Sequence, residues 1–531
     1  FAKQMGIPEA IDQVVTDIHG NRTGLSYGHL AWGLMGAIAT RRDHRLNHVE
    51  AWSVEHRHPL EAVMGTPVGD KDFTDDRLAD LLGVLGDPEG QVAQAIEDRV
   101  GHRLVRAYRL PTEVGRADTT TVSVYHDRDA LEGLLAFGKS KDHRPDLRQL
   151  VEALGTLDPA GLPLVTSTLP GNSADDPLYW PIRQRMVRII GHPDWLFVGD
   201  SKWHSAETLA RIHRAHGWFL TPLPMKGTIP EELATWLQQA PRRLTPIRLL
   251  DAKGHWRVVG HRFEVERQVR WTDPATGEVV TVPERVFLVC RTSFKQQQIQ
   301  GLIERLARAE AALKAKDGHR AKDPAAFEAE VQALVEQHRV ADLLSVKVSW
   351  TIEREEKWLG RGRPGPKRLK EGREHHRARA YSTNAPPSRL TLQQAVEQYA
   401  GQWQPERDFH RLKGGVLKVA PIFLRTDWQL RGLLLLVTLV LRLLTLIEFV
   451  ARRNLAAKGA TVTGLYAGAP RKATARPTAE RLLAAFTGLT LYTVRLGNRV
   501  HRHLSPLTAL QKHILKYLGL PRSIYRALES G

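Results

Sequence analysis

Residues 399–415 read YAGQWQPERDFHRLKGG, and this stretch decides how the rest of the chain is interpreted. Because each residue of an α-helix advances by about 100°, one face would carry an aromatic ring, an amide, a carboxylate and a cation within roughly 60°. These side chains are Tyr399, Gln402, Glu406 and Lys413. Such a face suits a metal-bound phosphate, although an amphipathic surface helix with ordinary ion pairs is the alternative. Proline removes a helix hydrogen bond, so Pro405 predicts a kink or a new helix start.

The spacing of these residues resembles the YREK signature of DDE transposases from bacterial insertion sequences. Tyr399, Glu406 and Lys413 match the signature, whereas Gln402 stands at the Arg position and departs from it. The resemblance covers roughly residues 110–450. It is strongest around residues 399–415 and around three short motifs, which are Asp118-Thr119-Thr120, Gly171-Asn172 and Gly199-Asp200-Ser201.

The resemblance implies an α/β chain with an RNase H-like core. In that fold the first catalytic Asp lies on the first strand, the second follows the fourth strand, and the Glu lies on a later helix. In this sequence those residues would be Asp118, Asp200 and Glu406. Asp200 follows Asp118 by 82 residues and Glu406 follows Asp200 by 206. The long second interval is similar to that of insertion-sequence transposases with a β-rich insertion before the Glu.

Other acidic residues compete for each of the three positions. Asp127 and Asp129 compete with Asp118, and Asp175, Asp176 and Asp194 compete with Asp200. We favour Asp118 and Asp200 because each adjoins a strand-like run, residues 119–125 and 195–199, whose rigid backbone can hold a ligand. Asp408 competes with Glu406 but would lie about 200° further round the helix.

Three converging carboxylates point to two Mg²⁺ ions, for which Mn²⁺ can substitute, about 4 Å apart at a phosphodiester. The resemblance then implies cleavage at transposon ends followed by strand transfer into target DNA. Tyr399, Gln402 and Lys413 would position the DNA backbone. Two other functions stay open: a nuclease of the same fold without strand transfer, and a DNA-binding relative that has lost catalysis, which Gln402 and Pro405 leave possible.

Composition points to a polyanionic partner. The chain has 76 Lys and Arg against 58 Asp and Glu, a formal net charge of +18. Double-stranded DNA, as transposon terminal repeats and target, is the first candidate and an anionic membrane the second. The single cysteine, Cys290, excludes an internal disulfide and a cysteine-based zinc site. We expect a cytoplasmic, nucleoid-associated homo-oligomer without a signal peptide and not bound to a membrane.

The sequence divides into five predicted regions. Residues 1–90 are expected to form a helical N-terminal module with a possible DNA-reading role. The RNase H-like core follows in two parts, residues 91–224 and 378–450, separated by an inserted β-rich and helical domain with a basic tail at residues 225–377. Residues 451–531 are expected to form a helical C-terminal region. Because the chain begins with Phe1 rather than Met, we expect further residues before it.

Two segments have a specific interpretation. Residues 361–379 are densely basic, and their Gly and Pro content predicts no regular element. Arg361, Arg363, Lys367 and Arg368 would contact DNA phosphates, and the first four residues resemble an AT-hook, with a solvated linker as the alternative. Residues 432–450 are apolar enough to span a bilayer, but Arg442 and Glu448 favour a buried helix.

Overall fold

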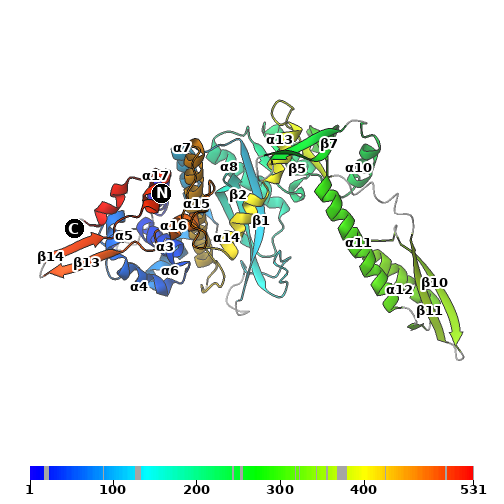
Figure 1. Cartoon of the computed structure of the whole chain (residues 1–531), viewed down its shortest axis with the longest axis horizontal. Coiled ribbons are helices and arrows are strands. Elements are labelled where there is room, and N and C mark those ends of the chain that lie inside the picture. The colour runs from blue at the N-terminus through cyan, green and yellow to red at the C-terminus, as the bar shows by residue number, and fades with distance from the viewer. Residues whose placement is uncertain are drawn as a thin grey trace. The chain divides into compact units, whose positions relative to one another are not determined.

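The computed structural model describes residues 1–531 except 17–22, 88, 126–132, 242–243, 251–254, 317–318, 322, 342–343, 354–356, 367–378, 425, 497–498 and 530–531. The chain forms two compact units, and Figure 1 shows their elements. The first comprises Phe1–Trp203, Arg214–Trp218 and Gln398–Gly531; the second comprises His204–His213 and Phe219–Glu397. The second unit therefore extends past both ends of the insertion predicted at 225–377.

Helices alone form the described part of residues 1–90. They are α1 (Ala2–Met5), α2 (Ile7–Val14), α3 (Tyr27–Arg41), α4 (Leu46–Glu55), α5 (Arg57–Met64) and α6 (Asp75–Leu85), and α7 (Gln91–Tyr108) follows. Ser26 begins α3 as its N-cap, accepting a hydrogen bond from the His29 N–H. Asp75 and Asp76 occupy the first turn of α6, where the helix dipole favours negative charge.

A four-stranded mixed sheet forms the centre of the first unit. Its strands are β1 (Val114–Val124), β2 (Arg148–Leu157), β3 (Leu162–Pro170) and β4 (Leu196–Val198). They lie in the order β3-β2-β1-β4, with β2 antiparallel to both neighbours and β4 parallel to β1. The connection from β3 to β4 runs through η1 (Asp176–Leu178) and α8 (Tyr179–Ile190), and α8 packs on the first three strands. A further 3₁₀ turn, η2 (Ser201–Trp203), follows β4.

The apolar stretch predicted as a buried helix is part of α15 (Asp427–Ala457), which packs on α3, α6 and β3. By length and composition it is the one helix among the described residues that could cross a membrane, but 94% of its most apolar 18-residue window is buried. Its backbone approaches α6 closely: a Cβ atom on Gly432 would lie 2.1 Å from the Leu82 carbonyl oxygen. Glycine is therefore required at this crossing.

Both ionised side chains within residues 432–450 of α15 have partners. Arg442 forms a buried ion pair with Glu97 of α7, and Glu97 also pairs with Arg185 at 2.7 Å. Glu448 forms ion pairs with Arg407 and Arg411. An unpaired buried ion costs several kcal/mol, so these contacts are needed for the helix to be buried at all.

The C-terminal region departs from the predicted helical structure. Residues 451–531 contain α16 (Ala479–Ala484), the hairpin of β13 (Leu491–Leu496) and β14 (Arg499–Leu504), α17 (Ala509–Leu518) and η3 (Arg522–Leu528). The prediction took the leucines around 489–491 as helix positions. Tyr492, Thr493 and Val494 instead favour a strand, because β-branched and aromatic side chains fit an extended backbone.

A five-stranded sheet lies in the second unit, in the order β5-β12-β8-β7-β6. The bounds are β5 (Trp218–Pro222), β6 (Thr245–Leu250), β7 (Trp256–Thr272), β8 (Val279–Arg291) and β12 (Arg379–Thr383), with helices α9 (Ala206–Arg214), α10 (Ile229–Gln238) and α13 (Leu392–Ala400). The hairpin predicted around residues 273–277 is confirmed: β7 and β8 pair antiparallel, and Gly277 turns the chain with a φ of 72°.

The second unit also contains a helical hairpin and a small sheet. These elements are α11 (Thr292–Ala315), β9 (His319–Ala321), α12 (Pro324–Gln337), β10 (Leu344–Glu353) and β11 (Lys357–Pro366). The prediction that Gly and Pro prevent a regular element after residue 361 is wrong as far as Pro366. Backbone pairing of β11 with β10 outweighs the weak strand propensity of these residues.

Replacing Glu152 with Gln should flatten the pH dependence of stability. Burial raises the pKa of Glu152 from 4.5 to about 8, so folding takes up a proton between these values. The free energy of unfolding of the wild type should therefore fall by about 1.4 kcal/mol per pH unit between about pH 5 and 7.5 from this group alone. Urea titrations at several pH values should show this slope reduced in Glu152→Gln. The exposed Glu9→Gln control should keep the wild-type slope.

Candidate active site

Asp118 and Asp200 lie at the same edge of the first unit's sheet. Asp118 is in β1, and Asp200 follows β4 by two residues. The two strands are parallel, with Arg116 opposite Val198, so continuing this register by two residues brings Asp118 level with Asp200. An Asp118 carboxylate oxygen accepts a hydrogen bond from the Thr119 N–H at 2.7 Å. One from Asp200 accepts bonds from the Lys202 N–H at 3.1 Å and the Tyr179 hydroxyl at 3.3 Å.

Glu406 lies in the first turn of α14 (Trp403–Lys413), which packs on β1 and α15. The negative charge of Glu406 is one of the influences on the pKa of the Asp118 carboxyl group. The pKa of Asp118 is raised to about 6, mainly by burial; the negative charges of Asp200 and Glu406 act in the same direction, whereas the Thr119 N–H and Lys141 oppose the shift. The three carboxylates therefore share one electrostatic environment although they are distant in sequence.

Two lysines and a further aspartate complete this environment, and the sequence interpretation missed both lysines. Lys141 donates to the Thr119 carbonyl oxygen at 2.5 Å and pairs with Asp175 at 3.3 Å, and Lys202 also pairs with Asp175. Burial opposes ionisation of Asp175, but the two lysines hold its pKa below the ordinary value. From the sequence alone, Asp175 is only a competitor of Asp200. Nothing in the sequence links Lys141 to this site, whereas Lys202 follows Asp200 closely enough to have been considered.

The presence of Gln402 in place of the arginine of the YREK signature has a structural reason. The buried Arg116 forms an ion pair with Asp158 at 2.7 Å and donates to the Gln398 carbonyl oxygen at 2.7 Å and to Gln402 Oε1 at 3.3 Å. An arginine at position 402 would set two guanidinium groups against each other. Gly401 belongs to the same arrangement, because a Cβ there would lie 2.7 Å from the Arg116 guanidinium.

Pro405 does not disturb the helix. Tyr399 lies in α13, Gln402 is the N-cap of α14, and Pro405 is the third residue of α14. The first turn of a helix leaves its N–H groups without intrahelical partners, so a proline there loses no hydrogen bond. The expected new helix start is therefore found, and the four residues do not share one continuous helix face.

The remaining residues of the 399–415 stretch have separate environments. Lys413 ends α14 and pairs with Asp142 at 2.6 Å, and Tyr399 is half-buried. Asp408 is buried beside Arg407, and this burial raises its pKa to about 7. Glu406, by contrast, is exposed. Asp408 is thus the interior carboxylate of α14 and Glu406 the accessible one.

Several predicted residues cannot be related to this site. Arg361 and Arg363 belong to β11 in the second unit. Lys367 and Arg368 lie outside the described residues, as do Asp127 and Asp129. Asp194 accepts a hydrogen bond from Trp218 Nε1 at 2.6 Å. The prediction that the four basic residues contact DNA stays a prediction.

Carboxylate oxygens are ligands of the kind that Mg²⁺ prefers in proteins. Among the described residues, no group of three His, Cys, Asp or Glu side chains could hold one ion together. Mg²⁺ is commonly bound through one or two carboxylates and retains several waters. The pKa of Asp118 is raised mainly by burial, and the negative charges of Asp200 and Glu406 add to this shift.

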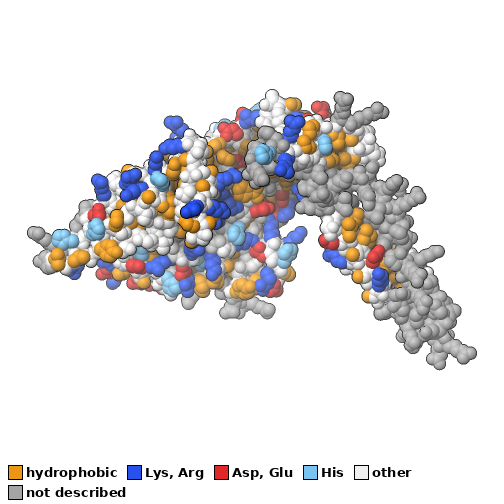
Figure 2. All heavy atoms as spheres, in the orientation of Figure 1, with side chains coloured by type: hydrophobic (Ala, Val, Ile, Leu, Met, Phe, Trp, Pro, Cys, Tyr) orange, Lys and Arg blue, Asp and Glu red, His pale blue; other side chains and the backbone are white. Residues whose placement is uncertain are grey.

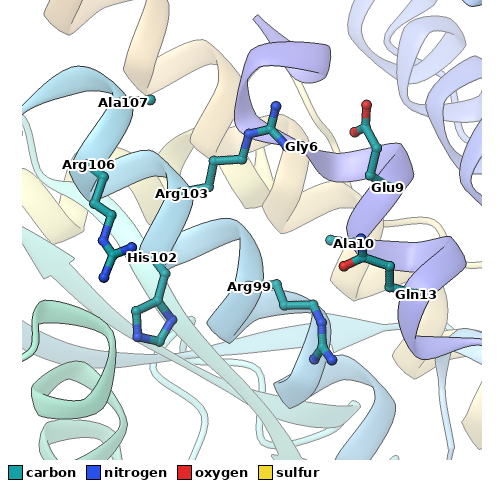
Figure 3. A pocket seen from close by; sticks show the side chains of 9 residues that line it. All are labelled: Gly6, Glu9, Ala10, Gln13, Arg99, His102, Arg103, Arg106 and Ala107. Carbon is teal, nitrogen blue, oxygen red and sulfur yellow. The ribbon is translucent and has the colours of Figure 1, made fainter.

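A second polar feature of the first unit is a groove of about 630 Å³ between α2 and α7. Figure 3 shows Arg99, His102 and Arg106 projecting from α7, and Glu9 and Gln13 projecting from α2. None of the predicted site residues lines this groove. Because its arginines are exposed and lie away from the predicted site, charge-removing substitutions in this groove can serve as controls.

The pKa of Asp118 tests whether the carboxylates converge in solution. Asp200→Asn and Glu406→Gln should each lower this pKa from about 6, because each removes a negative neighbour, and Lys141→Ala should raise it. The measurement is ¹³C NMR of labelled Asp carboxyl groups in metal-free buffer. Asp146→Asn, at an exposed ion pair with Arg144, is the control and should leave the pKa unchanged. If Glu406→Gln also left it unchanged, Glu406 would lie outside the site.

Comparison with known proteins identifies no family. No protein-family model and no curated protein matches the chain. Among solved structures, the chain is similar to a piggyBac transposase in a synaptic complex with hairpin DNA, with a TM-score of 0.26 and 11% sequence identity. The match covers 52% of this chain and 57% of that one, so it spans little more than half of the transposase. Similarity at this level identifies neither the fold nor the function of this chain.

Proposed function

We propose that the chain is a DDE transposase with an RNase H-like core, which cleaves DNA at transposon ends and joins those ends to target DNA. The proposal rests on the parallel pairing of β1 with β4, which brings Asp118 level with Asp200, and on the packing against β1 of α14, which carries Glu406. Convergence of the three carboxylates at this sheet edge of a basic protein would favour chemistry on a phosphodiester.

The RNase H-like part of the proposal rests on the order of the elements. Asp118 lies on the first strand, Asp200 follows the fourth strand, and Glu406 lies on a later helix. This is the arrangement that the resemblance to insertion-sequence transposases implies. The second unit occupies most of the chain between Asp200 and Glu406, as an insertion before the catalytic Glu would.

Each residue of the site then has a role. Asp118, Asp200 and Glu406 would hold two Mg²⁺ ions. When bound, such ions activate the attacking oxygen and stabilise the leaving oxygen of an in-line displacement at phosphorus. Asp175 holds the ammonium groups of Lys141 and Lys202 beside the carboxylates, where they can bind the DNA phosphate that approaches. Lys413, fixed by Asp142, is a further phosphate contact.

The same proposal extends to partners and location. Terminal repeats and target DNA are the expected substrates, and two ends are held together most simply by a homo-oligomer. A chain of this kind encoded by a bacterial insertion sequence would act on the nucleoid in the cytoplasm. Gln402 does not argue for an inactive relative, because Arg116 accounts for its presence.

Asp118→Asn, Asp200→Asn and Glu406→Gln should each lower the rate of DNA cleavage by about a thousandfold or more, because each removes a charge that holds metal. Binding to the same DNA should change little, since phosphate contacts by basic residues supply most of the affinity. The assay measures Mg²⁺-dependent nicking of plasmids that carry the inverted repeats flanking the gene. Asp146→Asn is again the control and should cleave at the wild-type rate.

A second assay supplies pre-cut ends and target plasmid. Joined products are expected if the chain is a transposase, whereas nicking without joining would identify a nuclease of the same fold. Unchanged cleavage by Asp200→Asn would contradict the proposed site. Binding without Mg²⁺-dependent cleavage by the wild type would contradict the catalytic proposal altogether.

A further inference from the structure

The positive charge of the chain is concentrated near its C-terminus. Residues 451–531 contain 14 Lys and Arg and two Asp and Glu, a net charge of +12, against +18 for the whole chain. Residues 1–90, which were expected to read DNA, contain eight basic and 14 acidic residues, a net charge of −6. A polyanion would therefore be attracted to the C-terminal region and repelled by the N-terminal helices.

Ten basic side chains in the described part of this region are exposed. Those with exposed positions are Arg453, Lys458, Arg471, Lys472, Arg476, Arg481, Arg495, Lys516, Arg522 and Arg526. In the part of the chain that the structure describes, none of these ten forms an ion pair, whereas the two acidic residues are engaged. Glu480 pairs with Arg411 at 2.9 Å, and Glu529 accepts a hydrogen bond from the Leu504 N–H at 3.1 Å.

Aromatic rings hold several of these cations in place. The Lys472 ammonium lies 4.5 Å and the Arg481 guanidinium 4.0 Å from the centre of the Tyr466 ring. Arg453 lies 5.0 Å from the centre of the Phe449 ring. Cation–π contacts restrict a side chain without neutralising its charge, so the cations are ordered before any partner arrives.

The β13–β14 hairpin adds a shape that fits a DNA groove. Figure 1 shows it extending beyond α5 and α17, and Figure 2 shows hydrophobic and histidine side chains at this end of the first unit. Tyr492, Val494 and Leu496 are 55%, 52% and 65% exposed, and no acidic residue occurs between Arg481 and Leu528. A lone two-stranded hairpin is marginally stable in water, and the major groove of DNA admits such a ribbon.

The region is attached to the helix that carries Glu406. The Ala479 N–H donates to Glu448 Oε1 at 3.0 Å, and Arg411 of α14 pairs with Glu480 of α16. Asn454 of α15 donates to the Tyr517 carbonyl oxygen at 2.8 Å. DNA bound to the C-terminal region would thus be held by elements packed directly on α14 and α15.

We propose that residues 451–531 form the principal docking surface for double-stranded DNA. The cations between residues 458 and 481 bind the phosphate backbone, and the β13–β14 hairpin enters a groove. The inference rests on the proposed function for the identity of the partner, but it is independent of catalysis.

The test compares two double variants of the full chain. Lys472→Gln/Arg481→Gln removes the two cations on Tyr466, and Arg99→Gln/Arg106→Gln removes two exposed arginines from the α2–α7 groove as a charge-matched control. Affinity for duplexes of several sequences is measured by fluorescence anisotropy across a salt series. The first variant should bind all duplexes more weakly, with the slope of log affinity against log salt reduced by about 0.9 for each lost phosphate contact. The control should retain the wild-type slope.

The hairpin is tested with Arg495→Gln, which should also weaken duplex binding, and circular dichroism checks that each variant is folded. An unchanged slope in Lys472→Gln/Arg481→Gln, or an equal loss in the control, would overturn the inference. So would binding of vesicles containing anionic lipid without binding of duplex DNA. If the wild type cleaves DNA while Lys472→Gln/Arg481→Gln binds normally, only this inference fails. Absence of any duplex binding by the wild type at low salt would reject the proposed function as well.

Discussion

The burial of α15 is the constraint on which the first unit depends. A helix of 31 residues whose middle is apolar on nearly every side must be enclosed, and its two buried ions, Arg442 and Glu448, must then be paired. Glu97 of α7 supplies one partner, and Arg407 and Arg411 of α14 supply the other. These pairs fix α7 and α14 against the same helix. Because α14 also carries Glu406, charges in the interior determine where an exposed carboxylate lies.

The candidate site combines excess negative charge with cations that are already engaged. Asp175 is shared by Lys141 and Lys202, and Lys413 is paired with Asp142. The lysines therefore neutralise Asp175 more than they neutralise Asp118, whose pKa stays raised by burial and by Asp200 and Glu406. The arrangement keeps negative potential at one edge of the sheet while ammonium groups stand next to it. This separation of charge suits a ligand that brings both a cation and an anion, such as a metal-bound phosphate.

Local sequence predicted those features that local chemistry determines. The strands at Asp118 and Asp200, the turn at Gly277, the helix start near Pro405 and the burial of α15 all follow from propensity or from apolar runs. The sequence did not reveal features that depend on distant partners. Lys141 reaches Thr119 and Asp175 only because the chain folds back between β1 and β2, and Arg116 meets Gln402 across 286 residues. In β11, pairing with β10 stabilises a strand that its Gly and Pro disfavour.

The insertion between Asp200 and Glu406 also sets the order in which the site is made during synthesis. The ribosome adds about 5–20 residues per second, so the 206 residues between them take on the order of 10–40 seconds. Throughout that interval the nascent chain presents two aspartates without the third carboxylate and without α15 to support it. Under the proposed function, an unfinished or truncated product that lacks Glu406 would be unable to cleave DNA. The late position of Glu406 in the sequence would thus delay the proposed cleavage activity until the whole site has been synthesised.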